Sequence, residues 1–212
     1  MNRRGFFNKM INGMPDVFFM GIQVAFPSQV RENIWQEFDI LISNNRGIQS
    51  AGRKRGFYNE IVKKLTEISI GFELGYWDFI KNERDADNEF DNWVAELEEA
   101  TANEIEGTDS LILEPLIIDD GELDYIVVTV AFLIKGNDKH EQIFRQINSI
   151  TEDQFDDLTS YLTLITQIRN IDFESCIADA AFLIPGNINE VLSTQEIYGE
   201  GWEYLVEITK KL

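Results

Sequence analysis

The chain of 212 residues contains a single cysteine, Cys176, and a single histidine, His140. One cysteine excludes an internal disulfide and is typical of proteins from a reducing compartment. These two residues alone cannot build a His-rich or Cys-rich metal site, and no local motif supports them as a nucleophile and its base. We therefore expect Cys176 to pack as a small apolar side chain within a strand.

Long apolar runs are also missing. No window approaches the ~18 uncharged apolar residues that a membrane-spanning helix requires, so no integral membrane segment is expected. The pair Arg3-Arg4 resembles the start of a twin-arginine export signal, but Pro15 and Asp16 stand where such a signal has its apolar segment. The sequence therefore predicts a cytoplasmic protein.

Motifs that bind cofactors or carry out catalysis are missing as well. The sequence has no Gly-rich phosphate loop, no nucleophile elbow and no dinucleotide fingerprint. We therefore expect no cofactor and no enzymatic activity.

Basic residues are scarce and unevenly placed, with 18 Lys or Arg against 38 Asp or Glu and a net charge of −20. Residues 1–64 hold ten basic against five acidic residues, whereas residues 65–212 hold eight against thirty-three. Nucleic-acid binding needs a basic footprint, so a nucleic-acid partner is not expected. The asymmetry favours an unidentified protein partner, or self-association of the basic first third with the acidic remainder.

One basic cluster stands out in the predicted loop 44–56. It consists of Arg53, Lys54 and Arg55, flanked by two glycines. Such a cluster can bind a phosphate or an acidic partner, and it can equally be a solvated loop that caps the next helix. We treat these three residues as a candidate partner-binding site.

The hydrophobic pattern predicts an α+β protein. The sheet is expected to be mixed or antiparallel, with about four to six strands packed against helices. Residues 1–16 are interpreted as an N-terminal extension and residues 17–212 as one domain. Strands are expected at 17–26, 72–80, 111–118, 123–134 and 173–184, and helices at 29–43, 57–70, 90–105, 139–149, 151–165 and 193–197; the tail 202–208 fits either type.

Two strand predictions concern the arrangement of the sheet. The run 125–134 is apolar on both sides, which places it at the centre of the sheet. The segments 111–118 and 123–134 flank an Asp-Asp-Gly-Glu turn and predict a hairpin. Residues 23–26 (QVAF) echo residues 129–132 (TVAF), which suggests two strand-helix-strand halves.

Capping boxes mark the starts of two predicted helices. Thr151 with Gln154, and Ser193 with Glu196, have the spacing in which each side chain bonds the backbone of the other. These helices are therefore expected to begin next to Thr151 and Ser193.

Carboxylates supply the candidate metal ligands. Asp119, Asp120 and Asp124 crowd the predicted hairpin turn, where a divalent ion or a paired-acid hydrolase can use them, although turns favour Asp for conformational reasons alone. A second cluster matches positions 1, 3, 5, 7 and 12 of a calcium loop, but Phe90 stands where that loop needs glycine. This second cluster consists of Asp85, Asp87, Glu89, Asp91 and Glu96.

Two further features have open interpretations. Asp179 lies within an apolar strand, where its carboxylate needs a hydrogen-bond partner or an edge position. Tyr76 and Trp77 either pack in the core, which is the commoner place for strand aromatics, or form an exposed patch that binds a partner.

Four motifs follow one another along the chain: Ile22 to Phe26, the helix Phe57 to Leu65 leading to Gly75-Tyr76-Trp77, Asp124 to Val130, and Leu192 to Tyr198. Their order resembles a domain-of-unknown-function family of cyanobacteria and plastids, the family that includes the plant fluctuating-light acclimation protein. The resemblance implies no established reaction and no catalytic residues. Members often look membrane-attached through a Gly-rich apolar N-terminal region, and some are tied to photosynthetic regulation. This chain has only the short segment before Ile22, so neither property is expected here.

These observations favour a non-enzymatic interaction or regulatory domain. The acidic surface or an exposed aromatic patch would contact the partner. The alternative is a carboxylate-dependent protein that binds a divalent metal ion, or a hydrolase that uses one.

Overall fold

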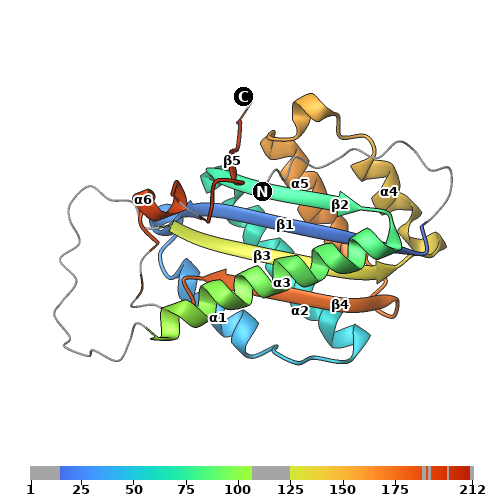
Figure 1. Ribbon diagram of the computed structural model, residues 1–212, viewed down its shortest axis with the longest axis horizontal. Helices are drawn as coiled ribbons and strands as arrows, with labels where there is room; N and C mark the ends of the chain where they lie inside the picture. The colour runs from blue at the N-terminus through green and yellow to red at the C-terminus, as the bar shows by residue number, and fades with distance from the viewer. Residues whose placement is uncertain (1–14, 107–124, 188–189, 191, 200, 211–212) are drawn as a thin grey trace.

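The computed structural model describes residues 15–106, 125–187, 190, 192–199 and 201–210 (Figure 1). Its strands form one five-stranded sheet in the order β4-β3-β1-β2-β5. All neighbouring strands are antiparallel, which confirms the predicted α+β class. The strands are β1 (Val17–Pro27), β2 (Leu74–Ile80), β3 (Tyr125–Lys135), β4 (Cys176–Ile184) and β5 (Val206–Glu207).

Helices cover both faces of this sheet (Figure 1). One face packs against α1, α2, α4 and α5, whose apolar side chains join the largest buried cluster. The long helix α3 crosses the other face, to which the short α6 also contributes. The helices are α1 (Ile34–Ser43), α2 (Ala51–Ile68), α3 (Glu83–Glu106), α4 (Glu141–Ile147), α5 (Leu158–Gln167) and α6 (Thr194–Ile197). Among the described residues, no helix is long and apolar enough to cross a membrane.

The two central strands, β1 and β3, are buried along almost their whole length. In β1, Phe18 and Met20 point toward the four-helix face, whereas Phe19 points toward α3. A strand covered on both faces needs no polar alternation, which is why the buried parts of both strands are apolar apart from Gln23 and Thr129. The central position expected for residues 125–134 is therefore confirmed.

The predicted hairpin between residues 111–118 and 123–134 is wrong. β3 pairs with β1 along its full length, and on its other side it pairs with β4 from Val127 to Ile134. No edge of β3 is left for a hairpin partner. Residues 111–118 themselves lie outside the described residues.

The suggestion of two halves agrees with the strand register. Gln23 and Thr129 lie directly opposite each other in β1 and β3, and they are 106 residues apart (129 − 23). The same offset relates Tyr76, the partner of Gln23 in β2, to Phe182, the partner of Thr129 in β4. An approximate twofold axis normal to the sheet therefore passes between Gln23 and Thr129.

Under this axis, each half places its first helix over the outer strand of the other half. In the first half, Trp35 of α1 donates its indole N–H to the carbonyl of Pro185, just after β4, at 2.9 Å. In the second half, Phe144 of α4 packs against Phe79 of β2 with ring centroids 5.2 Å apart. Because the helices cross over, both halves must be present for either one to bury its core.

Other element boundaries show which local sequence signals were sufficient to predict where a helix begins. Both capping boxes are present, and the one at Ser193 starts α6 as predicted. The one at Thr151 starts only the 3-10 turn Glu152–Gln154, so the helix predicted over 151–165 is wrong at its start, and α5 begins at Leu158. The predicted loop 44–56 is wrong in its second part, because the Ser50 hydroxyl accepts the Arg53 amide N–H and starts α2 at Ala51. The undecided tail forms β5, which pairs with Leu74 and Gly75.

Candidate interaction surface

Helix α3 lies across the sheet where three neighbouring strands carry small residues side by side, Gly21, Ala131 and Ala180. Its apolar side chains Ala86, Phe90, Trp93 and Leu97 recur at helical spacing and are buried. Gly21 of β1 permits the close approach, since a Cβ there would lie 2.8 Å from the Trp93 ring. The periodicity of helix 90–105 predicts a buried stripe of Phe90, Trp93, Leu97, Thr101 and Ile105; its first three members are confirmed, and the side chains of the last two lie outside the described ones.

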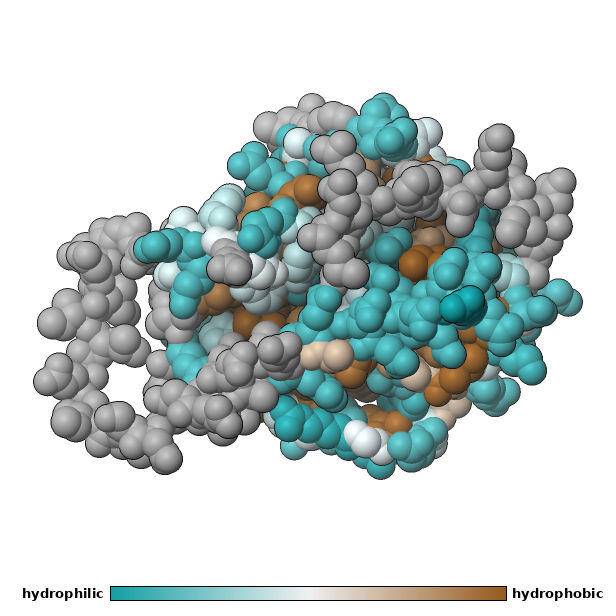
Figure 2. Space-filling view, in the orientation of Figure 1, coloured by the Kyte–Doolittle hydropathy of each residue, from teal (hydrophilic) through white to brown (hydrophobic). Residues whose placement is uncertain are grey.

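The exposed side of α3 is polar and rich in acids. Only one basic residue, Arg84, occurs in the 24-residue helix. Figure 2 shows hydrophilic residues gathered where α3 crosses this face of the molecule. We call the exposed acidic side chains of this helix the α3 acidic face; they are Glu83, Asp85, Asp87, Asp91, Glu96 and Glu98.

The calcium-loop interpretation of this segment is wrong. Residues 85–96 form continuous helix, in which alternate residues point about 200° apart and cannot converge on one ion. Glu89 is used differently, because it accepts the indole N–H of Trp93 at 2.9 Å. Among the described residues, no group of three His, Cys, Asp or Glu side chains is placed to hold a metal ion. The predicted ligands Asp119, Asp120 and Asp124 lie outside the described residues.

The basic cluster lies in the first turns of α2 rather than in a loop. Arg53 and Arg55 are exposed, and they form no ion pair within the described part of the chain. Lys54 points inward and forms an ion pair with Asp179 of β4, with both side chains about six-sevenths buried (13% and 15% exposed). The three residues therefore do not act as one site, and only the two arginines can meet a partner.

Asp179 has the partners that its place in an apolar strand requires. Besides Lys54, the hydroxyl of Tyr58 donates to its carboxylate at 2.9 Å. β4 is also an edge strand, so both expected solutions apply. Burial, and then the charge of Asp179, raises the pKa of Tyr58 well above its ordinary value. An inward-pointing charge is one device that keeps an edge strand from pairing with another chain.

Cys176 lies beside this ion pair without reactive character. Its thiol is 3.9 Å from a carboxylate oxygen of Asp179. Burial and this neighbouring charge raise the pKa of Cys176 to about 12, although the Lys54 ammonium opposes the shift. The thiol is therefore protonated at neutral pH and is a poor nucleophile.

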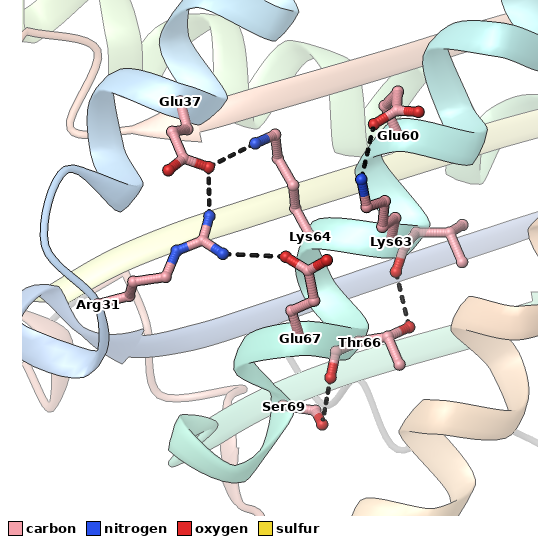
Figure 3. A network of polar contacts seen from close by, with 9 residues as sticks. Arg31, Glu37, Glu60, Lys63, Lys64, Thr66, Glu67 and Ser69 are labelled. Carbon is pink, nitrogen blue, oxygen red and sulfur yellow. Dashed lines mark hydrogen bonds and ion pairs between the residues drawn. The ribbon is translucent and has the colours of Figure 1, made fainter.

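Ion pairs neutralise much of the remaining charge on α2 (Figure 3). Arg31 donates to Glu37 of α1 and, at 2.9 Å, to Glu67 of α2. Lys64 of α2 also donates to Glu37, at 2.5 Å. The hydrogen bond from Lys64, helped by the charges of Lys64 and Arg31, lowers the pKa of Glu37. This network joins α1 to α2, and its two bases balance its two acids.

The two aromatic candidates are buried and cannot meet a partner. Tyr76 is 4% exposed and lies between Trp93 and Tyr204, at ring distances of 5.8 and 5.5 Å. Trp77 is 3% exposed, and its indole N–H donates to the carbonyl of Phe155 at 3.0 Å. Their place in the core is the commoner of the two alternatives that the sequence left open.

Buried polar groups were the features that sequence reasoning missed. Gln23 and Thr129, at the twofold axis, each keep a buried polar atom without a hydrogen-bond partner in the described part of the structure. His140 is fully buried next to the loop that precedes β4. Neither group has a sequence signal, because Gln23 and Thr129 are single polar residues in apolar runs, whereas His140 stands among polar residues that give no sign of its burial.

Comparison of the chain with protein-family models, with curated proteins and with solved structures finds no match. The function must therefore be argued from the surface and from the buried groups of this molecule.

Proposed function

We propose that this chain is a soluble, cytoplasmic, non-enzymatic interaction domain that binds a basic protein partner through the α3 acidic face. The observation that supports the proposal is the contrast between the two helical layers. Glu37 of α1 and Glu60 and Glu67 of α2 form ion pairs with neighbouring bases. On α3, the side chains that the structure describes include six exposed acids against a single base.

The arrangement on α3 costs stability, which argues for a role beyond folding. Glu83 with Asp87, and Asp87 with Asp91, are spaced four residues apart on one helix. Like charges at that spacing destabilise a helix by roughly 0.2–0.5 kcal/mol per pair. Glu83 and Asp85 in the first turn are offset by the helix dipole, but Asp91 is not.

Self-association is one form of this proposal. The exposed Arg53 and Arg55 of one copy would contact the α3 acidic face of another. Such a contact joins different surfaces and depends on charge, so it should weaken in high salt, where screening shortens to ~3 Å at 1 M. Sedimentation at low and high salt separates self-association from binding to a different protein.

The test is a comparison of two charge-matched variants in capture from the native host. The first variant, Asp85→Asn with Asp87→Asn and Asp91→Asn, removes three charges from the α3 acidic face. The control, Glu60→Gln with Glu141→Gln and Glu152→Gln, removes three exposed charges elsewhere. The proposal expects a basic protein that the wild type and the control both retain and the first variant loses. Equal capture by both variants would contradict it.

The carboxylate alternative is tested separately. Calorimetry with calcium, magnesium and manganese measures whether Asp119, Asp120 and Asp124 bind an ion. If the titrations give no heat and the ions cause no thermal shift, the chain binds none of these ions and the carboxylate alternative is contradicted. The family resemblance stays a prediction and contributes no residue to either proposal.

A further inference from the structure

His140 joins two segments that are far apart in the sequence. It ends the short 3-10 helix Asp138–His140, immediately before α4, and it is fully buried. Its Nε2 accepts the backbone N–H of Asp172 at 3.1 Å, in the segment that leads to β4. On another side its ring packs against the ring of Phe18 in β1, with centroids 5.4 Å apart and the two planes at 75°.

This geometry fixes the protonation state of the imidazole. A backbone N–H only donates, so Nε2 carries no proton, and the neutral ring must carry its proton on Nδ1. Nδ1 is buried without a partner among the described atoms. Burial lowers the pKa of His140; the nearby Asp172 carboxylate opposes this effect and Lys139 reinforces it.

Protonation would convert the contact from attractive to repulsive. Imidazolium has an N–H on both nitrogens, so its Nε2–H would face the N–H of Asp172. The bonded pair would therefore have to separate before the ring could be hydrated.

Other contacts also join these segments: Asn137 donates to the Ser175 hydroxyl at 2.6 Å, and two side chains donate to Asp172. Its carboxylate accepts from Lys139 at 2.8 Å and from Asn137 at 3.3 Å. Lys139 lowers the pKa of Asp172, so this carboxylate stays ionised well below neutral pH. Glu174 and Arg55 also act on Lys139, while Phe18 on the β1 side carries no titratable group. Asp138 and Glu141 flank the histidine on its own segment.

We propose that His140 is an acid-sensitive latch, which fastens the start of α4 to the segment 171–175 in its neutral form and releases it when protonated. The released segments would be 137–147 and 171–175, on the four-helix face of the sheet and away from α3. The latch would thus make one end of the second half respond to acidification, independently of any partner on the α3 acidic face.

The first half of the molecule provides an internal reference. Ile34 lies 106 residues before His140 (140 − 34), at the start of α1, and is likewise buried. An apolar side chain therefore satisfies the packing at this position. Packing alone does not explain the imidazole, whose distinguishing features are its acceptor nitrogen and its titration near neutral pH.

The test is NMR of the isotopically labelled full chain, in which the single histidine gives one imidazole titration. We expect the neutral Nδ1–H tautomer at pH 7.5 and a pKa below 6.5. Protection of the Asp172 amide from hydrogen exchange, corrected for the intrinsic rate, should fall between pH 7.0 and 5.5, and by no more than about tenfold. Opening exposes an imidazole with the ordinary pKa of about 6.5, and pH 5.5 lies one unit below that value, so protonation of the open form favours opening by at most about a factor of ten.

Two variants separate the latch from simple packing. His140→Gln keeps an acceptor oxygen without titrating, so Asp172 protection should no longer depend on pH in this range. His140→Ile copies the first half and should give lower protection that is also independent of pH. A histidine pKa of 6.5 or above, an Nε2–H tautomer, or unchanged wild-type protection at pH 5.5 would overturn the proposal, and these wild-type readings stand even if a variant fails to fold.

Discussion

The two halves of this molecule share a scaffold but differ in what they bury. Phe38 and Phe144, one in each half, occupy corresponding buried positions on the first helix after the central strand. Four residues before them, the first half has Ile34 and the second has His140. Apolar side chains at corresponding positions therefore build the fold in both halves. A polar residue that replaces one of them, as His140 replaces Ile34, needs an explanation other than packing.

The same comparison applies to the face that carries α3. The first half ends in a 24-residue acidic helix, whereas the second half contributes the four-residue α6 and the short β5. Both cover apolar side chains of the sheet, as the buried Trp93 and Ile197 show. Covering the sheet does not require a long acidic helix, which supports the proposal that the α3 acidic face has a separate role.

The largest expected effect tests whether the halves are equally needed. Phe38→Ala and Phe144→Ala should each lower the free energy of unfolding by about 3–5 kcal/mol, because each removes a buried ring from the shared core. Urea unfolding of the two variants measures this. A loss below about 1 kcal/mol for either one would break the equivalence of the halves.

The next effect concerns Asp179 and Glu73, which are also 106 residues apart (179 − 73). Asp179→Ala should cost about 2–3 kcal/mol, since it leaves the largely buried Lys54 ammonium unpaired. Glu73→Ala should cost only about 1 kcal/mol, the value of its hydrogen bond from Tyr125 at 2.5 Å. Chemical denaturation compares them, and the double variant Lys54→Met with Asp179→Ala should recover part of the larger loss.

A third, smaller effect is the pH dependence of stability. The folded-state pKa of His140 lies below its unfolded value, so stability is fully present above pH 6.5 and is lost as pH falls through the folded pKa. The loss should reach about 1.4 kcal/mol for each unit by which the pKa is lowered. His140→Ile should remove this dependence between pH 7 and 5.5, whereas the carboxylates of Glu37 and Asp172 act only at lower pH, because their pKa values are also depressed. An unchanged slope in the variant would count against the assignment.

The smallest expected change is a gain. The variant Asp85→Asn with Asp87→Asn and Asp91→Asn should be up to about 1 kcal/mol more stable than the wild type, since it relieves three like-charge pairs at four-residue spacing on α3, among them Asp85 with Glu89. Thermal unfolding at low salt measures the difference. A clear loss of stability would mean that these acids serve the fold.

Periodicity and capping signals were sufficient to predict most elements of the fold. The run 125–134, apolar on both sides, was sufficient to predict the central position of β3, and the residue types at Thr151 and Ser193 were sufficient to predict the two capping boxes. The hairpin prediction failed because local turn chemistry says nothing of whether a strand edge is already occupied. The loop 44–56 was misread because its glycines outweighed the single cap signal of Ser50.

The candidate site was less accessible to sequence reasoning. The acidic excess of α3 was visible in the sequence. A calcium loop, however, requires a turn within residues 85–96, and the apolar stripe of Phe90, Trp93 and Leu97 instead holds these residues in a helix against the sheet. Lys54 could not be separated from Arg53 and Arg55 by sequence, because its inward direction depends on Asp179, 125 residues away. Contacts of this range carry no local pattern.

The central claim is that the α3 acidic face binds a basic partner, and titration calorimetry with the captured protein tests it most directly. The account predicts at least a tenfold loss of affinity for Asp85→Asn with Asp87→Asn and Asp91→Asn, while Glu60→Gln with Glu141→Gln and Glu152→Gln binds like the wild type. Equal affinity of the two variants would contradict it.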